Sequence, residues 1–117
     1  MGLRAVQGDT VLTGTAASAG ASSGPIANPN YIQDIVCLIA VTAITGTSPT
    51  LSVAIEHSDD NSTYTAITGG GTAANITAAG NAVINARATK PYVRVTSTIG
   101  GTTPAVTYRV SALVFPN

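Results

Sequence analysis

Few side chains in this sequence could do chemistry, and most of those that could lie around its only histidine. His57 stands between Glu56 and Ser58, directly ahead of Asp59 and Asp60. A Ser–His–Asp triad needs three groups that converge from different parts of a fold, whereas neighbours along a strand point to alternate faces. We therefore interpret His57 as a histidine at the end of a strand, and we predict no catalytic residues and no enzyme activity.

The acidic run Asp59, Asp60 and Asn61 carries oxygen atoms of the kind that bind Ca²⁺. It lacks the alternating spacing of a calcium loop and the bidentate glutamate that closes one. Asp-Asp-Asn-Ser is also a common tight-turn sequence, because these side chains hydrogen-bond to their own backbone. We predict a turn and no metal, with a bound cation as the alternative.

Two further features could suggest chemistry, and both have simpler interpretations. Cys37 has no Cys or His at ligand spacing and lies in the most apolar stretch of the chain, which indicates a small buried hydrophobic residue. Gly69–Gly71 has no Lys or Ser/Thr at the spacing of a phosphate-binding loop. We predict no cofactor.

Charge and composition exclude several partners. The 117 residues include five Lys+Arg and five Asp+Glu, so the net charge is zero and only 9% of residues are charged. Such a chain has no excess of positive charge that would attract nucleic acid or an anionic membrane surface. Its longest apolar stretch, Ile35–Val41, has the length of a strand, and no apolar secretory segment follows Met1. A neutral surface rich in Thr, Ser and Asn suits a protein packed against other subunits, with a soluble neutral β-domain as the alternative.

From Ile32 onward the sequence is typical of β-structure. β-Branched runs alternate with turn clusters, without a helical apolar period. We predict an all-β fold, an antiparallel β-sandwich or jelly roll of about seven or eight strands, with a small open barrel as the alternative. The unbroken run Ile35–Val41 predicts a strand buried on both faces or packed against a partner. Seven residues are predicted to point inward: Val53, Ile55, Val93, Val95, Val106, Tyr108 and Val110.

Residues 1–31 differ from the rest, because they are rich in Gly, Ala and Ser and contain one short candidate strand, Thr10–Thr13. We predict an extended N-terminal arm over residues 1–31 and a single β-sandwich domain over residues 32–117. Terminal disorder and an arm that orders on a neighbouring subunit are equally compatible with this composition. The candidate partner contacts are four residues of this segment and three cations of the domain: Leu3, Arg4, Val6, Tyr31, Arg87, Lys90 and Arg94.

An internal echo links two segments of the domain. The sequence from Ile44 to Ile55 matches that from Ile99 to Val110 at an offset of 55 residues, with Ile, Gly, Thr and Pro in register. Each copy has a Gly that can take positive φ and a Pro that starts the next strand. We interpret both copies as β-hairpins.

Three segments carry a resemblance to a known group of proteins: Leu51–Ile67, Lys90–Val95 and Gly101–Pro104. Across residues 34–114 the chain resembles small structural proteins of tailed-bacteriophage virions, with a weaker similarity to discoidin-like jelly rolls. The resemblance implies a non-enzymatic capsid decoration (cement) protein, made in the cytoplasm of a bacterial host and located on the capsid surface. It also implies a major capsid protein as partner. The neutral surface and the apolar run Ile35–Val41 predict a closed homo-oligomer, and the resemblance implies a trimer that fits local three-fold positions of the shell. The alternatives are a minor tail protein and a receptor- or glycan-binding adhesion module.

Overall fold

The computed structural model describes residues 8–23, 26–27, 33–67 and 72–115, and every regular element within them is a β-strand. No helix in these ranges could cross a membrane, since none is long or apolar enough. All strand pairs are antiparallel, which confirms the predicted all-β, antiparallel class. The strands are β1 (Gly8–Ala17), β2 (Ile26–Ala27), β3 (Gln33–Ser58), β4 (Thr65–Ala66), β5 (Thr72–Ile76), β6 (Gly80–Ala88) and β7 (Tyr92–Phe115).

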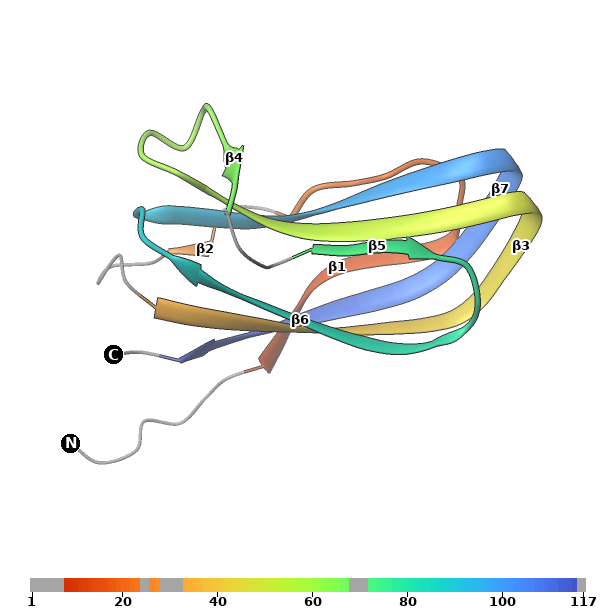
Figure 1. Cartoon of the computed structure of the whole chain (residues 1–117), viewed down its shortest axis with the longest axis horizontal. Helices are drawn as coiled ribbons and strands as arrows, with labels where there is room; N and C mark the ends of the chain where they lie inside the picture. Colours follow the sequence, from red (N-terminus) through yellow and green to blue (C-terminus); the bar gives the residue numbers. More distant parts are fainter. Residues whose placement is uncertain (1–7, 24–25, 28–32, 68–71, 116–117) are drawn as a thin grey trace.

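Two very long strands form the frame of the molecule. β3 has 26 residues and β7 has 24, and they pair with each other from Asp34 and Phe115 at one end to Ser58 and Tyr92 at the other. Both strands bend sharply near the middle, so the sheet doubles back and its two parts face each other (Figure 1). The bend is where the ladder between β3 and β7 loses its regular register, between Val41 and Thr50.

Each of the two facing parts contains one half of β3 and one half of β7. In the part we call the β1 layer, the strand order is β1, the C-terminal half of β7, the N-terminal half of β3, and β6. In the part we call the β2 layer, the order is β2, the N-terminal half of β7, the C-terminal half of β3, and then β4 and β5 along the same edge.

The hydrophobic core lies between the layers and follows the two-residue period of the strands. Ile35, Cys37, Ile39 and Val41 alternate inward from β3, and all seven residues predicted to point inward are buried. Cys37 is fully buried, and burial raises the pKa of its thiol to about 11, as expected of a small hydrophobic residue rather than a reactive one. The largest fully buried side chains are Ile35, Ile39, Leu51, Ile55, Val53, Val93, Val95, Val106 and Val110.

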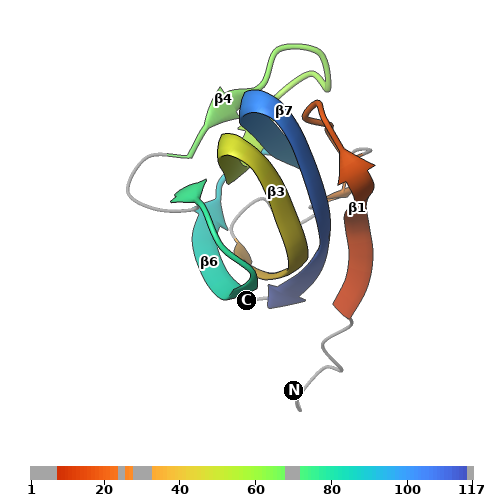
Figure 2. The same ribbon diagram turned by 90° about the vertical axis from the view of Figure 1, so that its right-hand side faces the viewer.

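The echoed segments are not hairpins, and this prediction is wrong. They are the bends of β3 and β7, which lie side by side and pair with each other through Thr45–Ala105, Thr47–Thr102 and Leu51–Ile99 (Figure 2). Gly and Pro here allow two paired strands to bend together. They do not form the turn of a hairpin, in which one chain segment reverses direction. We call this part of the molecule the corner.

The corner is built twice from the same parts. Gly46 and Gly101 have φ of 124° and 110°, and a Cβ on either would lie within 3 Å of backbone atoms of the other strand. Two residues further on, Ser48 and Thr103 have φ of 50° and 49°. The two matching segments therefore also share a backbone conformation. Only glycine fits the first of the two positions without strain, which explains why both copies have glycine there.

Residues 8–17 lie within the predicted N-terminal segment and include its candidate strand Thr10–Thr13. They form β1, which pairs with β7 from Leu113 to Val106 and buries Leu12 in the core. Further along, the backbone N–H of Ser23 donates to the carbonyl of Val95 at 2.7 Å. Short side chains in this part of the sequence allow its backbone to run along β7, and composition alone gave no sign of that pairing.

Candidate interaction surface

The surroundings of His57 do not assemble a catalytic group. Its Nδ1 accepts a hydrogen bond from the backbone N–H of Thr89 at 3.4 Å, and burial, together with the charge of Lys90, lowers its pKa. The hydroxyl of Ser58 donates to the carboxylate of Asp60 at 2.9 Å and accepts from the N–H of Asn61 at 3.0 Å. That serine therefore holds a turn and is not paired with the histidine.

The acidic run forms the turn that its sequence predicts. The Asp60 carboxylate accepts the backbone N–H groups of Ser62 and Thr63, both at 2.9 Å, and these bonds lower its pKa. Within the described ranges no three His, Cys, Asp or Glu side chains come together as a metal site. Oδ1 of Asp60 accepts all three of these bonds, from the hydroxyl of Ser58 and from the backbone of Ser62 and Thr63.

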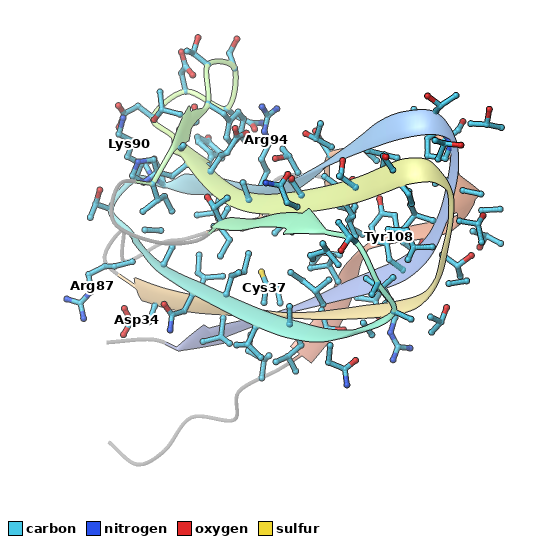
Figure 3. All side chains as sticks on the ribbon, turned by 45° about the vertical axis from the view of Figure 1, so that its right-hand side comes forward. Asp34, Cys37, Arg87, Lys90, Arg94 and Tyr108 are labelled. Carbon is cyan, nitrogen blue, oxygen red and sulfur yellow. The ribbon has the colours of Figure 1, made fainter. Side chains whose placement is uncertain are left out.

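The three candidate cations of the domain each meet a different carboxylate. Arg87 lies 3.1 Å from Asp34, Lys90 lies 3.5 Å from Asp59, and Arg94 lies 2.8 Å from Glu56. Figure 3 shows Arg87 and Asp34 together on the β1 layer, well apart from Arg94 on the β2 layer.

Arg94 has a further contact, since its guanidinium lies 4.2 Å from the centre of the Tyr64 ring. The cations are thus neutralised one by one and do not form a single basic patch. The candidate contacts Leu3, Arg4, Val6 and Tyr31, and the loop Gly69–Gly71, lie outside the described residues.

The outer face of the β1 layer shows the most exposed apolar surface among the described residues. Leu38 is 46% exposed and Val83 is 62% exposed, and the ladder between β3 and β6 places them opposite each other. On the other side of Leu38, β7 contributes Ser111. The next row of the ladder has Val36 between Asn85 and Leu113. We call the apolar strip formed by Val36, Leu38, Val83 and Leu113 the Leu38 strip.

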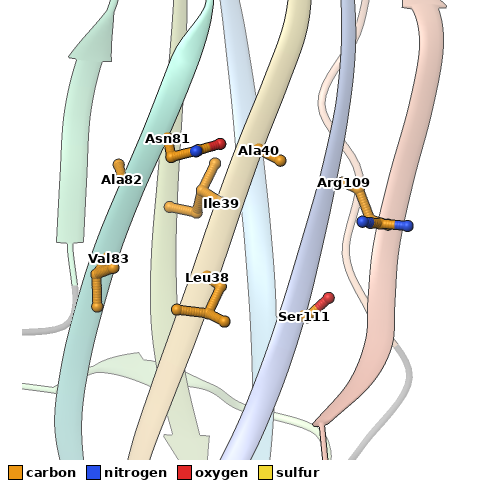
Figure 4. Close-up of a pocket in the computed structure, with 8 residues that line it drawn as sticks. All are labelled: Leu38, Ile39, Ala40, Asn81, Ala82, Val83, Arg109 and Ser111. Carbon is orange, nitrogen blue, oxygen red and sulfur yellow. The ribbon is translucent and has the colours of Figure 1, made fainter.

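The strip borders a shallow hollow of about 420 Å³ (Figure 4). Polar groups lie on its rim, with Asn81 from β6 and Arg109 and Ser111 from β7, around Leu38 and Val83. The apolar run Ile35–Val41 is therefore buried on one face only, and its second face carries Leu38 into solvent. Full burial on both faces, one of the two predictions for this run, is wrong.

Sequence reasoning missed the contribution of β6 to this surface. β6 runs from Gly80 to Ala88, and from Asn81 onward its more exposed residues alternate with more buried ones. The signal was present, because exposed Asn81, Val83 and Asn85 alternate with the smaller or buried side chains between them.

Comparisons with known proteins show what fold the chain has, but they do not show its function. No protein-family model matches the chain, and no curated protein sequence matches it. Among solved structures, the PBSX exported protein XepA is similar with a TM-score of 0.71 at 14% identity, over 95% of this chain. This chain spans 37% of the length of that XepA chain. The SPBc2 prophage-derived protein YomS is similar with a TM-score of 0.52 at 13% identity, over 99% of both chains. At these identities the likeness shows a shared all-β fold.

Proposed function

We propose that this chain is a non-enzymatic structural protein of a bacteriophage virion that decorates the capsid and stabilises it. The observation that carries the proposal is the likeness to a prophage-derived protein along 99% of both chains. That likeness and the sequence resemblance to phage virion proteins both support a phage origin.

The order of the strands supports a jelly roll as the finer class. Along the chain, strands of the β1 layer and of the β2 layer largely alternate. In each layer, one half of β3 and one half of β7 are the two central strands. In each layer an early strand and a later strand form the two edges, which is the arrangement of two interlocked Greek keys. Such a fold offers two broad outer faces for contact with a shell, and its ends carry turns.

The surface supports a role in assembly rather than in catalysis or nucleic-acid binding. The chain has no net charge, and its Arg87, Lys90 and Arg94 side chains are each paired with a carboxylate. The Leu38 strip adds apolar surface that a partner could cover. We propose the major capsid protein as that class of partner, and a closed homo-oligomer, with three copies at local three-fold positions, as the assembled form.

The location of the protein in particles tests the function directly. Purified particles from the source phage or induced prophage would be analysed by quantitative mass spectrometry and by electron microscopy with labelled antibody. Hundreds of copies on the head, and heads that lose DNA at lower temperature when the gene is deleted, are expected. A handful of copies at the tail tip would instead support the tail or adhesion alternative. Absence from the particle would overturn a virion role altogether.

A deletion shorter than the predicted arm is needed to test the candidate partner contacts near the N-terminus. Removing residues 1–24 would remove β1 and with it the buried Leu12, so the fold itself would suffer. Deleting residues 1–7 takes away Leu3, Arg4 and Val6 and leaves β1 whole. We expect an unchanged far-UV circular dichroism spectrum and weaker attachment to capsids stripped of the protein. Unchanged attachment would rule out these residues as shell contacts.

A further inference from the structure

β6 is an open edge of the β1 layer. It pairs with β3 on one side, from Gln33–Ala88 to Val41–Gly80, and no described strand pairs with its other side. Figure 2 shows β6 and β1 flanking the bends of β3 and β7 on opposite sides. An open edge presents unpaired backbone N–H and C=O groups in the spacing that another strand needs.

The two edges of the β1 layer differ in how well they are protected. The register of β1 shifts between Thr10 and Leu12 and again between Gly14 and Ala17, and such irregularities disturb a regular ladder. β6 keeps an unbroken register against β3 over all nine of its residues and contains no Pro or Lys. Only β6 therefore offers a straight edge that can continue the sheet.

The charges and side chains of β6 suit a second copy of the same strand. Its one charged residue, Arg87, is already paired with Asp34 at 3.1 Å, and the chain as a whole has no net charge. Two copies can approach along this edge without repulsion. The edge also carries Val83, the most exposed of the large hydrophobic residues described, beside Leu38 of the next strand.

We propose that β6 pairs antiparallel with β6 of a second copy of this chain, so that the β1 layers of two copies form one continuous sheet. Full overlap of the nine residues places Val83 opposite Asn85 of the partner subunit, and Arg87 opposite Asn81 of the partner subunit. In that register the two Val83 side chains are diagonal neighbours on the outer face, roughly 7–8 Å apart. The two Leu38 strips then join into one. The two Arg87 side chains are roughly 20 Å apart, beyond the distance at which exposed charges repel in salt.

This contact is two-fold, and it deepens the proposed function by naming a surface through which copies associate. Alone it gives dimers, and combined with a three-fold contact elsewhere it gives six copies. It predicts an even number of chains. The number of chains can be measured on the purified protein without any virion, so the edge contact and the capsid role can fail separately.

The test is the mass in solution of a charged edge variant and its matched control. Val83→Lys places a positive charge on the exposed face of the edge, where the two copies would bring their lysines together, and the high exposure of Val83 lets the fold tolerate it. Thr13→Lys makes the same change of charge at an exposed position on β1, at the opposite edge of the layer. Sedimentation velocity at micromolar concentration gives the masses, and circular dichroism checks the fold of both variants.

We expect two chains or a multiple of two for the unmodified protein, half that mass for Val83→Lys, and no change for Thr13→Lys. A monomer or a trimer for the unmodified protein would overturn the proposal, and so would a folded Val83→Lys variant of unchanged mass. A second measurement tests the register. The double variant Val83→Cys/Asn85→Cys should form disulfide-linked dimers under mild oxidation, whereas Thr13→Cys should not. Cys37 does not interfere, because it is fully buried and its pKa is raised to about 11.

Discussion

Substituting Gly101 by alanine should destabilise this protein more than the same change at Gly80, because a Cβ at Gly101 would meet backbone atoms of the other strand. At a φ of 110° an alanine is strained by about 1–2 kcal/mol. Its Cβ would also lie 2.7 Å from the carbonyl oxygen of Ser48 and 2.9 Å from the Cα of Pro49. Backbone atoms cannot rotate away, so the corner must shift, which adds about 1–3 kcal/mol by analogy with overpacked cores. We expect Gly101→Ala to lower the free energy of unfolding by about 2–5 kcal/mol.

Gly80 provides the matched control for this prediction. It also has positive φ, at 148°, but a Cβ there would meet nothing within 4 Å, so Gly80→Ala should cost only the strain of about 1–2 kcal/mol. Urea unfolding followed by far-UV circular dichroism measures both, since the chain has no Trp for fluorescence. The difference between the variants corresponds to a midpoint lower by about 1–2 M urea. Equal losses in the two variants would refute the assignment of a close backbone contact to the corner.

Three further predictions concern the core and the acidic turn. Val95→Asp should abolish folding, because it places an unpaired carboxylate at a fully buried position, and loss of the β-sheet circular dichroism signal would show it. Tyr108→Phe should lower the free energy of unfolding by about 1–2 kcal/mol, since the buried Tyr108 hydroxyl lies 2.7 Å from that of Ser97. The double variant Tyr108→Phe/Ser97→Ala should lose less than the sum of the two single variants, and strict additivity in urea titrations would contradict a shared hydrogen bond. Hydrogen bonds from the backbone of Thr63 and Ser62 lower the pKa of Asp60, so the ionised carboxylate stabilises the fold at pH values above its ordinary pKa of 3.8. This stabilisation is lost as the pH falls through the lower pKa of the folded state. Asp60→Asn should therefore flatten the dependence of stability on pH in that acid range, and an unchanged slope would count against the role of Asp60 in the turn.

The sequence predicted the class of fold and seven of the buried core residues, because two-residue alternation is a local signal. Val53, Ile55 and Val110 could be assigned from their immediate neighbours alone. The Asp60 turn was likewise predictable, since its hydrogen bonds join residues only two or three positions apart. Local chemistry and local pattern are what a single sequence shows best.

What could not be predicted depends on pairing between distant parts of the chain. Gly8–Ala17 becomes an edge strand because β7 offers it a ladder nearly a hundred residues later, and its own sequence indicated a strand only over Thr10–Thr13. The corner was mistaken for two hairpins for the same reason, because each turn signal was correct and its partner was unknown. The Leu38 strip needs three strands to come together before Val83 and Leu38 can be neighbours.

The doubled corner gives this single chain the arrangement of two related halves. Advancing 55 positions along the sequence carries Gly46 and Pro49 onto Gly101 and Pro104, and so carries the bend of β3 onto the bend of β7. The same step carries β1, an edge strand beside β7, to the region of β4 and β5, which are edge strands beside β3. It also carries β2 to the region of β6, to within a few residues. The strand order of one layer thus corresponds to the strand order of the other, and the size constraint on Gly46 at the bend of β3 has its counterpart at Gly101 in the bend of β7.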